Sequence, residues 1–173
     1  MKRRAIVWFR QDLRLHDNEA LAIATRMAEE VIPAYIFDER VYEGKTRFGF
    51  PKMGVFRKKF YLESVEDLRR NLKAIGSDLI IRTGKPEQIL ANIADEFKCS
   101  WVICNRERTY EEVLVQDALE KKLWALGLEL IYTRGKMLYH TQDLPAPVHH
   151  IPDVFSTFRK ETEHITPVRE PFA

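Results

Sequence analysis

The sequence predicts one α/β domain, a Rossmann-like three-layer α/β/α sandwich built on a five-stranded parallel sheet. Five short apolar runs rich in strand-forming residues recur along residues 1–133. Segments with helical periodicity stand between these runs, and most connections are short. Strands that alternate with helices form right-handed βαβ units and a parallel sheet covered on both sides. For five strands we expect the order 3-2-1-4-5.

The first apolar run, residues 4–9, predicts a strand that is buried on both faces. After a polar loop, Asp17 and Asn18 are good N-cap residues for a helix over residues 19–29, where apolar residues recur at helical spacing.

The second strand is predicted over residues 31–37. It contains Pro33, which has no N–H to donate and is therefore expected near the start of the strand or on an unpaired side. Residues 38–51 mix glycines and a proline with aromatic residues, which indicates a long ordered loop. Long loops in compact domains often carry function.

Residues 52–75 are predicted to form the longest helix, closed by Gly76 as a C-terminal cap. Its apolar residues fall on one helical stripe, expected to face the core. They are Met53, Phe56, Phe60, Tyr61, Val65, Leu68, Leu72 and Ile75. The charged residues between them are interpreted as a solvated face.

The same patterns continue to the fifth strand. Further strands are predicted at 78–82, 101–104 and 128–132, and helices at 86–98 and 109–126. The three tryptophans, Trp8, Trp101 and Trp124, are expected in the core.

Regularity fails after residue 133. We expect an α/β core over residues 1–133, an irregular extension over 134–164 with a short helix that packs on the core, and the start of an interdomain linker at 165–173. The helix of the extension is predicted over residues 155–164.

The composition excludes several classes of protein. The chain has 28 basic and 26 acidic residues, so its net charge of +2 does not suggest an autonomous nucleic-acid binder. Two cysteines do not make a disulfide framework, and the five histidines lack partners at metal-ligand spacing, so we expect no metal. With no apolar run long enough to span a bilayer and no signal-peptide core, the sequence predicts a cytoplasmic protein without membrane association.

Polar residues follow two of the predicted strands. In open parallel sheets, ligands bind beyond the carboxyl ends of the strands where the strand order reverses, here between the first and fourth strands. Arg10 and Asp12 follow the first, and Asn105 and Glu107 follow the fourth. A ligand pocket is one interpretation. The other is a surface network of salt bridges among Arg10, Asp12, Arg14 and Asp17 that fixes the first loop.

The usual phosphate-binding and nucleophile motifs are absent. None of the seven glycines falls in the loop after the first strand, which disfavours the common dinucleotide and triphosphate cradles. No serine or cysteine stands on a strand-to-helix elbow beside a base, and Cys104 is explained equally well as a small buried residue.

Several segments resemble a known family. Residues 6–21, Ile-Val-Trp-Phe-Arg-Gln-Asp-Leu-Arg-Leu-His-Asp-Asn-Glu-Ala-Leu, resemble the opening of DNA photolyases and cryptochromes. Residues 56–72, with Phe-Tyr-Leu-Glu-Ser-Val-Glu-Asp-Leu-Arg, are similar to the DASH branch of cryptochromes, as are residues 138–144 and 152–159. The resemblance covers nearly the whole chain.

The resemblance implies a two-part protein. The α/β half holds an antenna chromophore, and a helical half, absent from this sequence, binds FAD and DNA. The complete protein would act as a lyase that splits cyclobutane pyrimidine dimers with light and reduced FAD, or as a photoreceptor. This chain alone would lack the catalytic FAD site and have no catalytic residues.

The resemblance also implies a cofactor and its site. In DASH-like members the antenna is usually 5,10-methenyltetrahydrofolate, whose pterin N–H groups can donate hydrogen bonds to a carboxylate. Glu107 matches the family's position for that contact. Asn105 and Arg10 would line the pocket, with Phe37 and Asp38 at its side. A flavin-type antenna in a similar crevice is the alternative.

One consequence follows from the resemblance, and two alternatives to it stay open. An exposed apolar surface is expected where the helical half docks, formed by some of Met137, Leu138, Tyr139, Leu144 and Phe155. Fold alone would also permit a stand-alone nucleotide-binding signalling module of flavodoxin-like or stress-protein-like type. A third possibility is an inert scaffold that only packs against a catalytic half.

Overall fold

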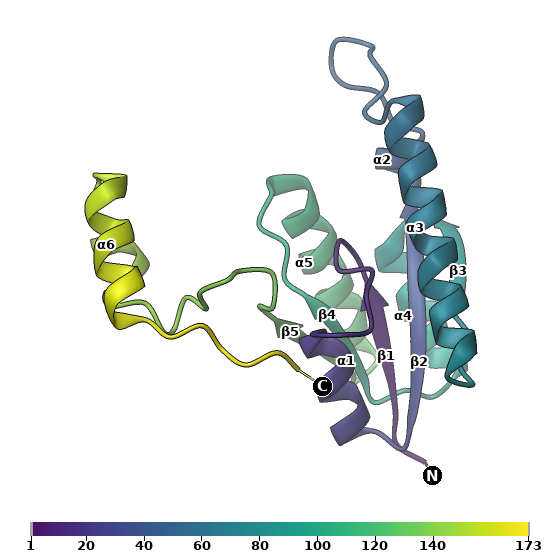
Figure 1. Ribbon diagram of the computed structural model, residues 1–173. Helices are drawn as coiled ribbons and strands as arrows, with labels where there is room; N and C mark the ends of the chain where they lie inside the picture. The colour runs from purple at the N-terminus through teal and green to yellow at the C-terminus, as the bar shows by residue number, and fades with distance from the viewer. Residues whose placement is uncertain (1, 173) are drawn as a thin grey trace.

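The computed structural model describes residues 2–172 and contains five strands and six α-helices in these residues. Figure 1 shows the sheet in the centre with helices in front of and behind it. The strands are β1 (Arg4–Phe9), β2 (Glu30–Asp38), β3 (Ile80–Gly84), β4 (Trp101–Asn105) and β5 (Glu129–Thr133). The helices are α1 (Glu19–Met27), α2 (Glu39–Tyr42), α3 (Val55–Ala74), α4 (Pro86–Glu96), α5 (Tyr110–Ala125) and α6 (Phe155–Ile165), with a 3-10 turn, η1, at Val148–His150.

The sheet confirms the predicted fold class. All four strand pairs are parallel, and the order is β3-β2-β1-β4-β5. Pro33 lies beside Val7 of β1, one residue before the pairing of β2 with β3 begins at Ala34. Its missing N–H therefore costs no hydrogen bond to β3.

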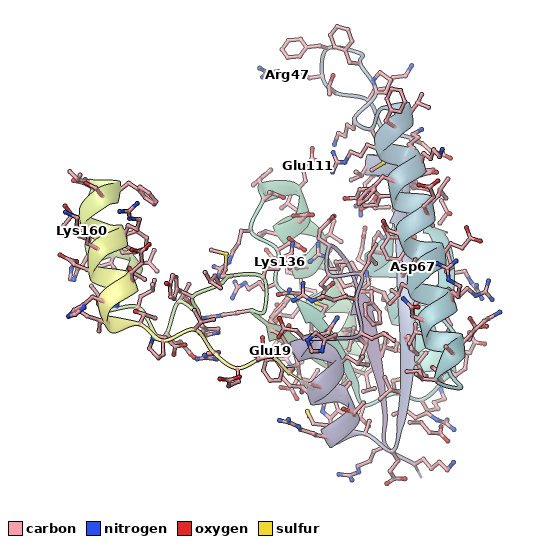
Figure 2. All side chains as sticks on the ribbon, viewed as in Figure 1. Glu19, Arg47, Asp67, Glu111, Lys136 and Lys160 are labelled. Carbon is pink, nitrogen blue, oxygen red and sulfur yellow. The ribbon has the colours of Figure 1, made fainter. Side chains whose placement is uncertain are left out.

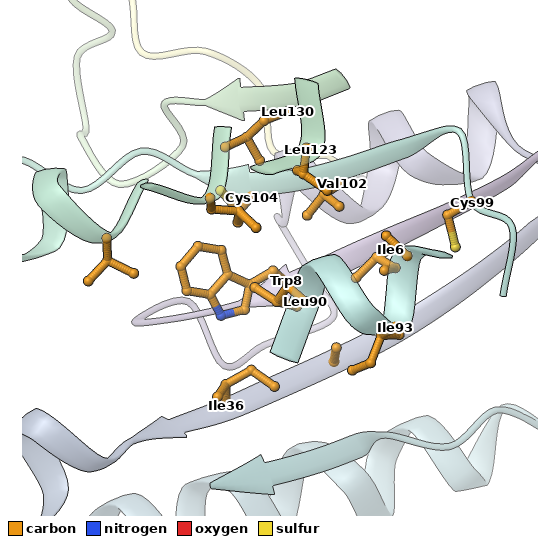
Figure 3. Close-up of a cluster of buried hydrophobic side chains, with 14 residues drawn as sticks. Ile6, Trp8, Ile36, Leu90, Ile93, Cys99, Val102, Cys104, Leu123 and Leu130 are labelled. Carbon is orange, nitrogen blue, oxygen red and sulfur yellow. The ribbon is translucent and has the colours of Figure 1, made fainter. Parts of the chain in front are cut away.

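Alternate residues of each strand face the two layers of helices. Ile6 and Trp8 of β1 pack in a cluster with Leu90 of α4 and Leu119 of α5, and Figure 3 shows Trp8 and Leu90 in this cluster. Val7 points to the opposite face, into a second cluster formed with α1 and α3. Burial on both faces explains why the strands are nearly continuous apolar runs.

Several element boundaries have clear local causes. The side chain of Asn18 accepts a hydrogen bond from the N–H of Leu21 and caps α1, as predicted. Gly76 and Gly127 follow the last turns of α3 and α5 at φ 80° and 71°, a conformation that glycine adopts at little cost.

The structure corrects several predictions of local structure. The loop over 38–51 begins with a short helix, α2, and the third strand lies two residues later than predicted. Trp124 is 83% exposed and lies outside the core. The first part of the long helix extends beyond the sheet, so Phe56 is 90% exposed and Phe60 is also exposed. Figure 1 shows this half of α3 beyond the end of the sheet.

The extension after β5 contains the predicted helix as α6, but α6 stands apart from the sheet and does not pack on the core (Figure 1). The chain then returns to the first loop. Asp17 and Phe172 exchange two hydrogen bonds, from the Asp17 N–H to the Phe172 carbonyl (3.0 Å) and from the Phe172 N–H to Asp17 Oδ1 (3.2 Å). These bonds attach the tail beside α1.

Candidate functional site

The main cavity lies at the carboxyl ends of β1 and β2 and has a volume of about 870 Å³. The ends of these strands form its floor, while α2, the loop after it and the first turns of α3 and α5 form its walls. Its lining is aromatic and charged, and includes Arg10, Phe37, Asp38, Arg40, Tyr42, Lys52, Arg57, Tyr61, Glu111 and Glu112. A cavity of this size accommodates an organic cofactor.

Three of the five predicted site residues, Arg10, Phe37 and Asp38, line this cavity. The guanidinium of Arg10 lies 4.3 Å from the centre of the Trp8 ring. The ring of Phe37 contacts Tyr35 and Tyr42, with centroids 4.9 and 5.0 Å away. The edge-to-face and tilted contacts of these rings form an apolar wall.

Asp38 both ends β2 and starts α2. Its carboxylate accepts a hydrogen bond of 2.9 Å from the Arg40 N–H, which caps the helix, and it also pairs with the Arg40 guanidinium. Arg40 reaches on to Glu87 at the start of α4 over 2.8 Å. The hydrogen bonds that Arg40 donates to Asp38 and Glu87 raise the pKa of Arg40, although burial opposes them. The cavity therefore has a fixed cation at its β2 side.

The other two predicted residues, Asn105 and Glu107, do not line the cavity. Both are buried, Asn105 as the last residue of β4 and Glu107 two residues beyond it. The Glu107 carboxylate pairs with the ammonium of Lys136, 2.5 Å away. Figure 2 shows Lys136 near the centre of the molecule, away from Arg47 in the loop between α2 and α3. The Oδ1 atom of Asn105 has no hydrogen-bond partner in residues 2–172.

Gln116 of α5 connects Arg10, which lines the cavity, with Glu107, which does not. It is 2% exposed, and its Oε1 accepts hydrogen bonds from Arg10 Nη1 (2.6 Å) and from the Glu107 N–H (2.7 Å). Its Nε2 donates to the Glu107 carbonyl over 3.2 Å. The exits of β1 and β4 do meet, as predicted, but a protein side chain fills the space between them. The cavity opens on the other side of β1, toward β2.

The loop between β1 and α1, residues 10–18, is stabilised by several internal contacts. The N–H of Arg10 donates to Asp12 Oδ1 over 2.9 Å, and both residues are buried. Arg14 and Asp17 form an exposed ion pair of 3.4 Å. The surface-network interpretation thus describes Arg14 and Asp17 but not Arg10 and Asp12.

Sequence reasoning missed Gln116, Lys136 and most of the walls of the cavity. A glutamine among the apolar positions of the 109–126 helix was a usable signal for Gln116, because a buried amide needs specific partners. Lys136 carried no signal, since it lies in an irregular segment. In residues 2–172 no three histidine, cysteine or acidic side chains gather as a metal site, and no helix is long and apolar enough to cross a membrane.

A doubly wound parallel sheet with a cofactor-sized cavity beyond its carboxyl edge defines a class of cofactor-binding α/β domains. The chain belongs to the DNA photolyase family, whose model matches residues 5–172. Over 165 residues it is 41% identical to the blue-light photoreceptor PHR2 of Arabidopsis thaliana, and over 169 residues 43% identical to the cryptochrome DASH of Xenopus laevis. These matches cover 95% and 96% of the chain.

Solved structures of a cryptochrome and a photolyase have the same fold as this chain. The chain superposes on a cryptochrome from Synechocystis with a TM-score of 0.92 at 38% identity, covering 98% of this chain and 35% of that one. A photolyase from Sulfolobus tokodaii, solved with two FAD molecules, matches with a TM-score of 0.78 at 26% identity. The chain spans about a third of the length of its relatives, 37% of PHR2 and 32% of the Xenopus protein.

Proposed function

We propose that this chain is the light-gathering domain of a cryptochrome of the DASH type and that it binds an antenna chromophore in the cavity at the carboxyl ends of β1 and β2. The observation that carries the proposal is the cavity of about 870 Å³ in a member of the photolyase family. The rings of Phe37, Tyr42 and Tyr61 offer stacking surfaces for a planar heterocycle, and Arg10 and Arg40 offer fixed donors. Flat rings for stacking together with two arginine donors suit a flavin-type antenna.

The second candidate is 5,10-methenyltetrahydrofolate at Glu107. Two buried acceptors support it, the Glu107 carboxylate and the unpartnered Oδ1 of Asn105, because a pterin edge presents N–H donors. A folate bound there would have to displace Lys136 from Glu107. Arg10 would act on this site through Gln116 and not by direct contact.

The activity of the complete protein is part of the same proposal. We infer that a helical part, as implied by the family, holds FAD, receives excitation from the antenna and uses it to repair pyrimidine dimers in DNA or to signal. The names of the relatives support both roles, since one is a blue-light photoreceptor and another is a photolyase. The exposed Met137, Leu138 and Phe155 of the extension offer an apolar surface for such a part.

Absorbance of the complete protein tests the proposal. After reconstitution with a flavin or with methenyltetrahydrofolate, the bound chromophore is measured in the near-ultraviolet and blue range. Val41→Trp fills the cavity, whereas Glu107→Gln removes the carboxylate charge. If Val41→Trp loses flavin binding and Glu107→Gln keeps it, the cavity is supported as the chromophore site. If Glu107→Gln loses folate binding and Val41→Trp keeps it, the second site is supported. Unchanged binding in both variants contradicts both assignments.

The two alternatives to an antenna domain, a stand-alone signalling module and an inert scaffold, make different predictions. A stand-alone signalling module would bind adenine nucleotides or FMN tightly without a helical partner, and family membership over residues 5–172 does not support it. An inert scaffold would leave light-dependent activity and its quantum efficiency unchanged when the domain is deleted.

A further inference from the structure

The segment between β2 and α3 presents apolar rings to solvent. Its residues 44–52 form a small hairpin closed by an antiparallel bridge between Lys45 and Pro51. Two backbone hydrogen bonds support it, from the Thr46 N–H to the Phe50 carbonyl (2.7 Å) and from the Lys52 N–H to the Gly44 carbonyl (2.9 Å). The loop therefore has a defined shape that holds its side chains outward.

We call the exposed apolar side chains of this region the 48–60 patch, defined by Phe48, Phe50, Val55, Phe56 and Phe60. Each is at least 67% exposed. Phe56 and Phe60 lie four residues apart, on one face of α3. None of the five lines the main cavity, so the chromophore site does not account for them.

Basic side chains surround the patch. Residues 44–62 contain six lysines and arginines and no acidic residue, although the whole chain is nearly neutral. Lys52 pairs with Glu111, and Lys59 lies 3.7 Å from Glu63. The other four, Lys45, Arg47, Arg57 and Lys58, form no ion pair with residues 2–172. The partner of this surface must therefore accept both apolar rings and positive charge.

The shape of the region favours one partner. In Figures 1 and 2 the hairpin is the outermost part of the molecule beyond α2, with Arg47 at its end. A single nucleic-acid strand also binds aromatic and basic residues, but in a groove. A convex projection with exposed phenylalanines and a basic surround is suited to insertion into the interface of an anionic membrane.

We propose that the 48–60 patch docks this protein peripherally on membranes that contain anionic lipids. Phe48 and Phe50 enter the headgroup and acyl boundary. Arg47 and Lys58 face the lipid phosphates and carboxylates, whereas Lys45, Lys52 and Arg57 also line the chromophore cavity. The sequence predicted no membrane association because it lacks a long apolar run, but a peripheral contact does not require one.

Co-sedimentation of the complete protein with vesicles tests this proposal. We expect binding to phosphatidylcholine vesicles that contain about one third phosphatidylserine, little binding to pure phosphatidylcholine, and release by salt. The double variant Phe48→Ser, Phe50→Ser should lower the partition coefficient by about a hundredfold. Arg47→Gln with Lys58→Gln should lower it roughly thirtyfold. Trp124→Ser, which removes a still more exposed ring on α5, should have no effect.

Three outcomes would overturn the proposal. One is equal binding of the wild-type protein and the double phenylalanine variant. Another is protection of Phe48 and Phe50 from solvent in the complete protein without vesicles, which would show that another part of that protein covers the patch. The third is binding of single-stranded oligonucleotides that requires these two rings while vesicles are not bound.

Discussion

Arg10 and Gln116 are joined by a hydrogen bond of 2.6 Å although they lie 106 positions apart in the chain. The bond links the exit of β1 to α5, and the same Gln116 oxygen accepts the backbone N–H of Glu107. One amide thus sets the relative position of the cavity and of the buried carboxylate after β4.

Removing this amide should destabilise the protein. Gln116→Leu leaves Arg10 and the Glu107 N–H without their acceptor, so we expect the free energy of unfolding to fall by about 2–4 kcal/mol. Gln116→Glu keeps the accepting oxygen and should lose less. Urea denaturation measures both, and equal stability of the two variants would contradict the role of the acceptor.

The ion pairs of Arg40 should matter more than those on the open surface. Arg40→Met leaves the largely buried Glu87 and Asp38 carboxylates without their cation, which should cost about 1–3 kcal/mol. Arg70→Met breaks a solvent-exposed pair with Asp67 and serves as the control, with an expected change within about 0.5 kcal/mol. Similar thermal midpoints for the two variants would refute this ranking.

Both cysteines should be inert in the folded protein. Burial raises the pKa of Cys99 to about 11 and that of Cys104 to about 12. Because these values lie above the unfolded value of about 8.5, the neutral thiols favour the folded state below that pH, and stability should fall as pH rises past it. Iodoacetamide at pH 8 should label neither thiol until urea unfolds the protein. Rapid labelling without urea would show that the sheet opens.

The attachment of the tail should weaken in acid. The hydrogen bonds from Arg169 lower the pKa of the Asp143 carboxyl, so the pair stabilises the tail above the ordinary carboxyl pKa of about 3.9 and is lost as pH falls below it. Asp143→Asn should produce the same loss at neutral pH. Amide hydrogen exchange of residues 166–172 measures it, and unchanged protection would mean that the Asp17–Phe172 bonds suffice.

Gly76 should tolerate a side chain poorly, although space is available. Gly76→Ala forces alanine to φ 80°, which should cost about 1 kcal/mol. Gly54→Ala, at φ −74° with open space around it, should change stability by only a few tenths of a kcal/mol. Equal effects in thermal unfolding would rule out the backbone explanation.

The sequence predicted the fold well because buried parallel strands leave a strong local signal. Periodicity indicated that α3 is amphipathic, but it could not show that Phe56 lies beyond the end of the sheet. Trp124 is a large apolar residue of the kind expected in a core, but it is exposed because Leu119 and Leu123 take the buried side of α5 and Trp124 lies on another side. In the same way, the exits of β1 and β4 were identified correctly, whereas the occupation of the space between them by Gln116 depends on long-range packing.

The central position of β1 also has a consequence for the order of folding. During synthesis its partner β2 emerges soon afterward, but β4, which covers its other edge, begins only at Trp101. Until then a nascent sheet of β3, β2 and β1 exposes an apolar, unpaired edge. Before residue 105 leaves the ribosome, this edge of β1 is therefore open to pairing with a wrong strand.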